Sequence, residues 1–459
     1  MKVALAAVLA AAGVIVAILF FLSGPTGIQV SPAVTSIGFS TPVTVRLTNP
    51  HGVRTVRGVV VQGGVENPVF AFHNSATRFF WRRHELPRTV VFPAGKSQAP
   101  NLKDGPARLL VEAVSNDFAG RTDSAAFDVV VVLEPPRVAS DGERHYINQG
   151  GTELVVFTPG GNWNEAGVRV GPYTFRSFPM PGEPAERFSM IAYPWDLPGN
   201  VTPVVYARNA AGAEATAPVT VTVKAKKFRA RDFELTDALA QKLVNSVDPN
   251  GTLAPGKELL ARFLFINGPM RRTDNQKLAD LRLKTEAKIL WAGPFLHWGK
   301  EEADFADLRN YIYHGQKVDQ QVHLGFDLSD VAHGPAFAAN NGRVVFAQDL
   351  GIYGNCVVLD HGYGVQSIYG HLSEIGVKVG DWVDKGQKMG IAGETGLAGG
   401  IHVHFGMQVD GVQVNPREWW DEHWIHDHVL RRLQPESSSA GTPAARPAEA
   451  KPHHHKKKR

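Results

Sequence analysis

The 459-residue sequence contains a single cysteine, Cys356, and therefore no C-x-x-C pair. One cysteine cannot form an intramolecular disulfide, and a redox dithiol or a thiolate zinc site needs more than one thiol. Any metal ion must therefore be held by histidine, aspartate or glutamate side chains. The cysteine content is compatible with an oxidising or a reducing compartment, so it does not decide where the protein resides.

Positive charge is also scarce outside one short segment. The formal net charge is +4, but residues 451–459 carry four lysines and one arginine, so the remaining residues sum to −1. A nucleic-acid-binding surface needs basic side chains clustered on a folded face, and the sequence therefore argues against one. Residues 434–459 are rich in Pro, Ser, Ala and Gly and are predicted to form a disordered basic tail. Such a tail could add a weak, salt-sensitive attachment to anionic wall or lipid headgroups.

The chain begins with a long uncharged run. Residues 3–22 contain no charged or strongly polar side chain, and a helix of this length spans about 30 Å, the hydrocarbon thickness of a bilayer. A cleaved signal peptide is the alternative, but its apolar region is shorter, about 7–15 residues, and ends at a small-residue cleavage site. Here Ala10-Ala11-Ala12 lies within the run and Phe20-Phe21-Leu22 follows it. We therefore predict an uncleaved transmembrane signal anchor at residues 1–25. Whether this segment is retained or cleaved, the rest of the chain is exported.

The exported part is predicted to be rich in β-structure. The 46 glycines and 30 prolines indicate many turns, and Val43, Val45 and Leu47 alternate with polar residues, as in a half-buried strand. We predict one β-sandwich module at residues 26–135 and a second at 136–224. Their similar strand-turn-strand endings lie about 90 residues apart, which suggests two tandem immunoglobulin-like modules.

The hydrophobic period then changes. Thr236 and Asp237 can cap a helix in which Leu243 and Val244 belong to an apolar stripe. Residues 225–310 are therefore predicted to be a mixed or helical connecting segment. It could be a scaffold, a spacer, or a flap over the region that follows.

Histidine and aspartate are concentrated after this segment. His323 and Asp327 lie four residues apart, while His402 and His404 flank a valine and would project from the same face of a strand. Imidazoles and a carboxylate brought together from two strands form a metal constellation, and these ligand types suit zinc. A catalytic zinc site needs three protein ligands and one open position. Because the sequence offers more than three candidates, the spacing alone leaves the ligand set open. His361 is interpreted as a structural residue.

At this point the sequence resembles the lysostaphin-like, or LytM-type, zinc endopeptidases. The resemblance covers residues 317–421, and its motifs occur in the family's order. They are His323-x-Gly325-x-Asp327, Tyr369-Gly370-His371-Leu372-Ser373, Gly393-Glu394-Thr395-Gly396, His402-x-His404-Phe405 and the closing Val414-Asn415-Pro416. The family's usual residues are absent at three places, where this chain has Glu394, Ile401 and Gly406 instead.

The resemblance implies a two-sheet β-fold, a Zn²⁺ cofactor and cleavage of peptide bonds in bacterial peptidoglycan. It implies that His323, Asp327 and His404 are the zinc ligands, and that His371 and His402 are the two unliganded catalytic histidines. We favour His402 as the base, because it lies two residues from a ligand on the same strand face, and His371 as the oxyanion donor. None of the three departures is a ligand or a catalytic residue.

We therefore expect a mainly β chain with a LytM-type zinc peptidase domain at residues 311–433. The predicted function is a membrane-anchored zinc metalloendopeptidase that hydrolyses cross-links or stem peptides of peptidoglycan. It would be a single-pass protein of the cell membrane with its catalytic domain in the periplasm or extracytoplasmic space. Expected partners are peptidoglycan, the inner or cytoplasmic membrane and envelope proteins, and no nucleic acid.

Two further hypotheses concern regulation. The alternative function is a non-catalytic wall-binding regulator that activates another peptidoglycan hydrolase. Non-catalytic members of the resembled family typically lack ligands, whereas all five positions are filled here. In the second hypothesis, residues 232–310 immediately precede the site and cover its open metal position, so that the chain is autoinhibited.

Overall fold

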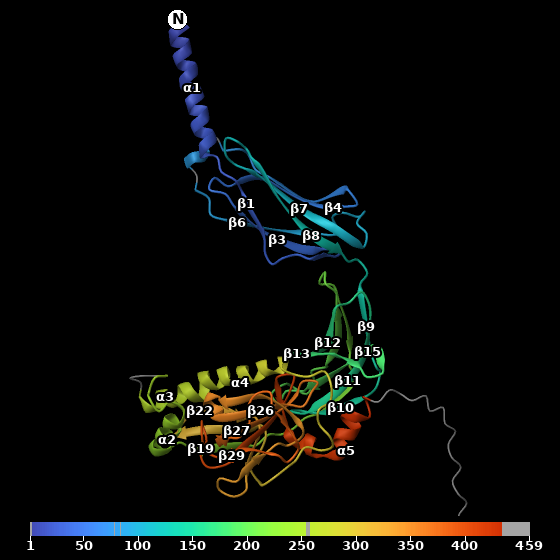
Figure 1. The fold of residues 1–459 in the computed structure, drawn as a ribbon, viewed down its shortest axis with the longest axis vertical. Helices are drawn as coiled ribbons and strands as arrows, with labels where there is room; N and C mark the ends of the chain where they lie inside the picture. The colour runs from blue at the N-terminus through green and yellow to red at the C-terminus, as the bar shows by residue number, and fades with distance from the viewer. Residues whose placement is uncertain (1, 78, 83, 254–257, 434–459) are drawn as a thin grey trace, which may run out of the picture.

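The computed structural model describes residues 2–77, 79–82, 84–253 and 258–433, with side chains from residue 7 onward. The chain is mainly β, as predicted. Figure 1 shows the N-terminal helix and three successive β-rich parts, which together form an elongated molecule. The predicted disordered tail lies outside the described residues.

The first element is helix α1 (Lys2–Leu22), which extends away from the sheets in Figure 1. Its described side chains are almost all exposed, among them Phe20 and Phe21. Among the residues whose side chains are described, which in α1 are residues 7–22, no helix is both long and apolar enough to cross a membrane. The predicted role of α1 as a membrane anchor stays a prediction.

Residues 27–131 form a two-sheet β-sandwich. One sheet has the order β1-β3-β6 and the other β2-β8-β7-β4-β5. Val43, Val45 and Leu47 are buried between the sheets, so the predicted alternation is confirmed. The elements are β1 (Gly27–Val30), β2 (Ser36–Ile37), β3 (Thr41–Thr48), β4 (Val53–Gln62), β5 (Val65–His73), η1 (Phe80–Arg82), β6 (Arg88–Ala94), β7 (Gly105–Ser115) and β8 (Thr122–Val131).

Residues 136–224 form the second module, with sheets β14-β15-β11-β9 and β13-β12-β16-β17 and a parallel pair of β10 and β18. The strands are β9 (Pro136–Ser140), β10 (His145–Asn148), β11 (Thr152–Gly161), β12 (Glu165–Val170), β13 (Tyr173–Arg176), β14 (Phe178–Met180), β15 (Glu183–Ala192), β16 (Val204–Arg208), β17 (Glu214–Pro218) and β18 (Val221–Lys224).

The second module shares its hydrophobic core with the C-terminal part of the chain. One cluster of buried apolar residues runs from Ile147 to Leu433. The Phe188 ring packs edge-on against Tyr363 at 4.8 Å between centroids, and the Asp410 carboxylate accepts hydrogen bonds from the backbone N–H and the guanidinium of Arg176. The domain boundary predicted at residue 224 therefore does not separate two hydrophobic cores.

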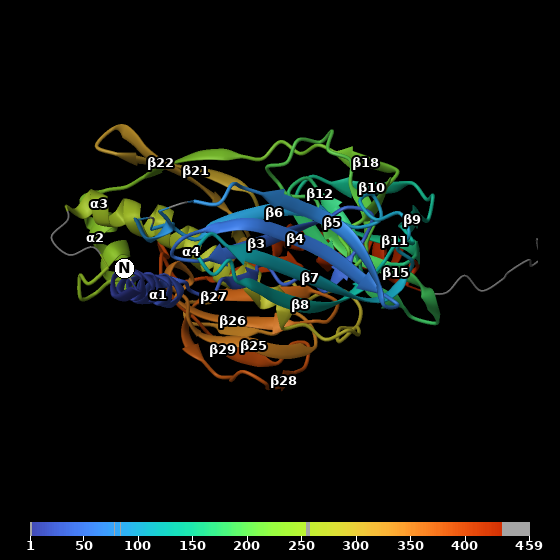
Figure 2. The ribbon, with the colours of Figure 1, turned by 90° about the horizontal axis from the view of Figure 1, so that it is seen from above.

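The connecting segment contains the predicted helix. The Thr236 hydroxyl accepts a hydrogen bond from the Leu239 N–H at the start of α2, and Leu243 and Val244 are buried. Figure 2 shows α2, α3 and α4 at one end of the molecule, near β21 (Asp307–Tyr313) and β22 (Gln316–His323). The elements are β19 (Ala230–Glu234), α2 (Asp237–Val247), α3 (Leu259–Phe265), η2 (Ile266–Met270), α4 (Arg271–Asp280) and η3 (Leu281–Leu283).

The C-terminal part contains a ten-stranded sheet whose main order is β20-β23-β30-β27-β26-β25-β28, and a three-stranded sheet, β19-β21-β22. Because β19 pairs in parallel with β21, the smaller sheet crosses the predicted boundary at residue 311. The elements are β20 (Lys300–Ala303), β21 (Asp307–Tyr313), β22 (Gln316–His323), β23 (Phe326–Ser329), β24 (Pro335–Phe337), β25 (Gly342–Asp349), η4 (Gly351–Tyr353), β26 (Asn355–Asp360), β27 (Val365–Ile375), β28 (Trp382–Val383), β29 (Lys388–Ala392), β30 (Val403–Val409), β31 (Val412–Val414), η5 (Pro416–Trp420), α5 (Glu422–Ile425) and η6 (His426–Leu430).

Candidate metal centre

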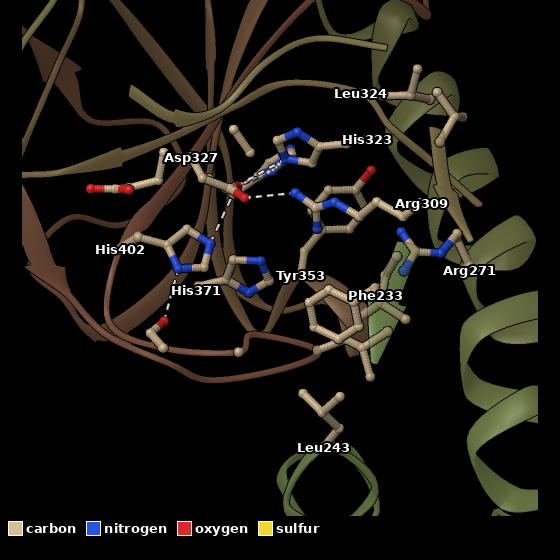
Figure 3. A pocket seen from close by; sticks show the side chains of 18 of the residues that line it. Phe233, Leu243, Arg271, Arg309, His323, Leu324, Asp327, Tyr353, His371 and His402 are labelled. Carbon is tan, nitrogen blue, oxygen red and sulfur yellow. Dashed lines mark hydrogen bonds and ion pairs between the residues drawn. The ribbon is translucent and has the colours of Figure 1, made fainter. Parts of the chain in front are cut away.

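The five residues named from the sequence lie together in one cleft of about 440 Å³. Strand pairing explains why residues far apart in sequence meet there. Asp327 on β23 is paired with His404 on β30, and β30 is also paired with β27, where His371 follows the last paired residue, Gly370. His323 ends β22, and His402 immediately precedes β30. Figure 3 shows the labelled members of this group around the cleft.

His323, Asp327 and His404 form a compact group of candidate ligands. Each offers a ligand atom within 4.8 Å of the others. His323 Nε2 lies 2.9 Å from Asp327 Oδ1 and 3.0 Å from His404 Nδ1, and His404 Nδ1 lies 3.4 Å from the same carboxylate oxygen. Two imidazoles and one carboxylate are a common ligand set of catalytic zinc sites. The donor set and its spacing therefore fit a zinc ion.

The tautomer of His323 is fixed by the backbone. Its Nδ1 lies 3.0 Å from the carbonyl oxygen of Asp304. A carbonyl can only accept, so Nδ1 carries a proton and Nε2 is the ring atom that faces Asp327 and His404. This is the arrangement in which a metal-binding histidine is oriented by its second ring nitrogen.

Asp327 has different partners on its two carboxylate oxygens. Oδ1 faces the histidines, including His402 Nε2 at 3.2 Å, whereas Oδ2 accepts a hydrogen bond from Arg309 Nη2 at 2.8 Å. Burial alone would raise the pKa of Asp327, but the charge and hydrogen bond of His323, with the hydrogen bonds from the other two histidines, outweigh it. Together they hold the pKa of Asp327 well below its usual range, so the carboxylate is ionised at neutral pH.

The two other histidines stand beside this group. The rings of His371 and His402 lie 4.9 Å apart. Their Nδ1 atoms donate to the carbonyls of Thr395 and Gly400, both at 2.8 Å, which leaves each Nε2 free of a backbone partner. Burial, and the charges of the neighbouring histidines, hold the pKa of His371 well below its ordinary value. Two imidazoles are therefore available for proton transfer or hydrogen bonding next to the candidate ligands.

The backbone of His371 is strained. Its φ is 63°, in the left-handed region that few residues other than glycine adopt. Such strain persists only where the surroundings enforce it, and it is concentrated at functional sites. Here the hydrogen bond to Thr395 and the pairing of β27 with β30 hold the residue in place.

The connecting segment forms part of the cleft wall. Phe233, Leu243 and Arg271 are among its lining residues. Lys242 on α2 forms a 2.8 Å ion pair with Glu394, one of the three departures noted in the sequence motifs. Residues of the segment 232–310 thus lie beside the cleft, and the hypothesis that they cover its open metal position stays a prediction.

His361 is a buried structural residue, as interpreted from the sequence. Its Nδ1 donates to the Asn341 carbonyl at 2.8 Å, and its Nε2 lies 2.7 Å from Ser367 Oγ. Burial lowers the pKa of His361 to about 4, so the ring is neutral. It lies outside the group of candidate ligands.

Sequence reasoning missed Arg309 and Lys242 as neighbours of the site. Arg309 reaches Asp327 because β21 folds back on β22, and Lys242 reaches Glu394 across 152 positions of sequence. No local spacing reports either contact. A local signal for the hairpin of β21 and β22 is the turn at His314-Gly315, where both residues have positive φ.

Comparison with known proteins agrees with this geometry. The model of Peptidase family M23 matches residues 321–416. The chain is 34% identical over 96 residues to the DD-carboxypeptidase/endopeptidase Mpg of Neisseria meningitidis, which is 21% of this chain and 22% of that protein. It is 38% identical over 93 residues to the peptidoglycan DD-endopeptidase ShyA of Vibrio cholerae, covering 20% and 22% of the two chains.

A third relative is named as an activator of hydrolases and not as a peptidase. The murein hydrolase activator EnvC of Escherichia coli is 38% identical over 82 residues, which cover 18% of this chain and 20% of EnvC. The chain therefore spans about a fifth of the length of each of these curated relatives.

Proposed function

From the premise that residues 321–416 form an M23 peptidase domain, we propose that the protein is a zinc metalloendopeptidase that hydrolyses cross-links or stem peptides of bacterial peptidoglycan. The observation that carries the proposal is the convergence of His323, Asp327 and His404 with two further histidines in one cleft.

The proposed chemistry follows from the donor set. Zn²⁺ held by His323 Nε2, Asp327 and His404 would supply a Lewis acid and lower the pKa of a bound water to about 7. The histidines 371 and 402 present Nε2 atoms whose orientation is fixed through Nδ1. One ring takes a proton from the attacking water and passes it to the leaving amine, and the other donates a hydrogen bond to the developing oxyanion. We retain His402 as the base and His371 as the oxyanion donor. Because His371 Nδ1–H donates to the Thr395 carbonyl, His371 Nε2 can donate to the oxyanion only when the ring carries a second proton.

The activities for which the relatives are named support the substrate class. ShyA is a peptidoglycan DD-endopeptidase and Mpg a DD-carboxypeptidase/endopeptidase. The match to the family model, residues 321–416, holds all five cleft residues. These names favour a peptide link of peptidoglycan as the scissile bond.

The proposal includes attachment to a membrane. The uncharged run at residues 3–22 supports a single-pass anchor in the cell membrane, formed by α1. The sandwiches and the peptidase domain would then lie in the periplasm or extracytoplasmic space, where peptidoglycan is found. Envelope proteins are further candidate partners.

The alternative is a non-catalytic activator of another hydrolase, and the similarity to EnvC favours it. The complete set of two imidazoles, one carboxylate and two neighbouring histidines favours an enzyme instead. An activator releases nothing from peptidoglycan in the absence of its partner hydrolase.

The experiment compares His404→Ala with His426→Ala in the full chain. His404 is buried among the candidate ligands, whereas His426 is exposed and paired with Asp427. We expect wild type and His426→Ala to bind about one zinc per chain and to solubilise purified sacculi, and His404→Ala to do neither. Zinc-dependent hydrolysis that survives in His404→Ala would refute the assignment.

A further inference from the structure

Arg309 contacts the candidate metal site from outside the M23 match. It lies on β21, whereas the match begins at residue 321. β21 pairs antiparallel with β22, so that Asp307 is opposite His323 and Arg309 is opposite Gln321. Figure 3 shows Arg309 beside Asp327, joined by the interaction with Oδ2.

The contact gives the two oxygens of the Asp327 carboxylate different partners. Oδ2 is taken by the guanidinium of Arg309, and Oδ1 alone faces His323 and His404. A carboxylate held in this way can offer only Oδ1 to a metal and cannot rotate without breaking a charge-assisted hydrogen bond. Both partners are shielded from water, since the side chains of Arg309 and Asp327 are 28% and 13% exposed.

The same stretch of chain also orients a second candidate ligand. The Asp304 carbonyl accepts from His323 Nδ1, and the Ala306 N–H donates to the His323 carbonyl at 2.7 Å. The stretch is itself anchored, because the Asp307 carboxylate accepts hydrogen bonds from the guanidinium groups of Arg229 and Arg231. Residues 304–309 thus support two of the three candidate ligands.

We propose that Arg309 is a positioning residue of the metal centre, which holds Asp327 Oδ2 so that Oδ1 stays in the ligand position. This inference rests on the proposed function, because it assigns a role toward the same zinc ion. Outer-shell partners of metal ligands typically change metal affinity by about 10- to 100-fold when they are removed.

The test measures zinc affinity by chelator competition on the full-length protein. Arg309→Met removes the hydrogen bonds and the charge, whereas Arg309→Lys keeps the charge and one donor. Arg343→Met is the matched control, because Arg343 forms an ion pair with Glu286 outside the residues that line the cleft. We expect affinity to fall about 10- to 100-fold in Arg309→Met, to be partly restored in Arg309→Lys and to be unchanged in Arg343→Met.

The outcomes separate the two proposals. Removing the positive charge of Arg309 would by itself raise the affinity for zinc, whereas loss of its hold on Asp327 would lower it. If wild type binds zinc and Arg309→Met binds it equally or more tightly, the positioning role is therefore wrong. The melting temperature of the metal-free protein shows whether a variant has lost its fold in general. We expect this temperature to be similar in Arg309→Met and Arg309→Lys. If wild type itself binds no zinc, the proposed function fails first.

A second and independent observation concerns the loop between β5 and β6. Residues 78–83 read Arg-Phe-Phe-Trp-Arg-Arg. Phe80 is buried with its ring 5.0 Å from that of His51, whereas Phe79 is 60% exposed and Trp81 is 39% exposed. Two exposed aromatic rings in a run flanked by arginines are unusual on a surface that faces only water.

This loop is fixed beside the end of α1. His51 Nε2 donates to the Leu22 carbonyl at 3.0 Å, the Gly24 N–H donates to Asp117, and the Ala119 N–H donates to the Ser23 hydroxyl. The 3₁₀-helix η1 accordingly lies next to the lower end of α1 in Figure 1. Phe118, in the neighbouring loop, is 50% exposed.

We infer that residues 79–82, with Phe118, dock into the headgroup region of the bilayer that α1 enters. Aromatic side chains concentrate at membrane interfaces, where their rings meet the apolar boundary. Arginines beside them can pair with anionic headgroups. The inference rests on the proposed membrane attachment, and it gives the first sandwich a fixed orientation on the membrane.

The test places an environment-sensitive fluorophore at Phe79→Cys or Val65→Cys in the full chain, reconstituted into nanodiscs that contain anionic lipid. Both positions are 60% exposed, but Val65 follows the turn at the opposite end of β4, and the native Cys356 is buried. We expect a blue-shifted emission and quenching by headgroup-labelled lipid at position 79, and neither at position 65.

Water-like emission at both positions, in protein that remains in the nanodisc, would overturn the inference while leaving the anchor intact. Protein that does not remain in the nanodisc would instead refute the membrane attachment itself, and the docking with it.

Discussion

The glycine at position 325 is required by the space around the candidate metal site. A Cβ atom built on Gly325 would lie 2.6 Å from the Phe405 carbonyl oxygen and 2.7 Å from Cε1 and Nε2 of His404. Ordinary van der Waals contact begins at 3.4 Å, so the atoms would have to separate by about 0.8 Å. The carbonyl belongs to β30, which also carries His404, so neither group can move away without moving the site.

We therefore predict that Gly325→Ala displaces His404 and impairs metal binding. Functional side chains have to be held within about 0.5 Å of their productive positions, and a misplacement of about 1 Å can cost about 100-fold in rate. Overpacking of a well-packed interior costs about 1–3 kcal/mol. We expect Gly325→Ala to bind zinc at least about tenfold more weakly and to lose most hydrolytic activity, with stability reduced by about 1–3 kcal/mol.

The matched control is Gly399→Ala. Gly399 lines the same cleft, but a Cβ there would meet nothing within 4 Å. Zinc affinity is measured by chelator competition, stability by denaturant unfolding and activity by release of soluble peptidoglycan fragments. Wild-type zinc affinity and stability in Gly325→Ala would refute the reasoning, as would an equal loss in Gly399→Ala.

Two further predictions concern contacts around the site. Lys242→Ala breaks the ion pair with Glu394, whose side chains are 45% and 47% exposed, so unfolding in urea should show a loss of less than about 1 kcal/mol; a loss of several kcal/mol would contradict this. Burial raises the pKa of Glu418 to about 7, against the lowering effect of hydrogen bonds from Asn148 and Thr152. Because the folded-state pKa exceeds the unfolded one, this group stabilises the fold below about pH 4.5 and loses that contribution, at most about 3 kcal/mol, as the pH rises through 7. Melting temperatures across pH 4.5–8 should fall more steeply for wild type than for Glu418→Gln, and parallel profiles would show that Glu418 is not responsible.

Features with a local sequence signal were predictable. The alternation at Val43, Val45 and Leu47 and the cap at Thr236 depend on residues within a few positions of one another, and both occur in the structure. The grouping of His323, Asp327 and His404 was predictable because each motif reads as part of a strand and the resemblance supplied the pairing.

Features that depend on long-range packing were not predictable. The shared core joins Phe188 to Tyr363, and no periodic pattern reports which two hydrophobic faces meet. The contacts of Arg309 with Asp327 and of Lys242 with Glu394 depend on strand register and on the placement of α2. Polar side chains on a strand or a helix look alike in sequence whether they face solvent or a site.

The central claim is tested most directly by mass spectrometry of the muropeptides that the purified full-length protein releases from sacculi when zinc is the only addition. The account predicts fragments cut at a peptide link of peptidoglycan, and none from His404→Ala under the same conditions. If wild type releases nothing alone but accelerates release by a second hydrolase, the protein is an activator and the catalytic account is wrong.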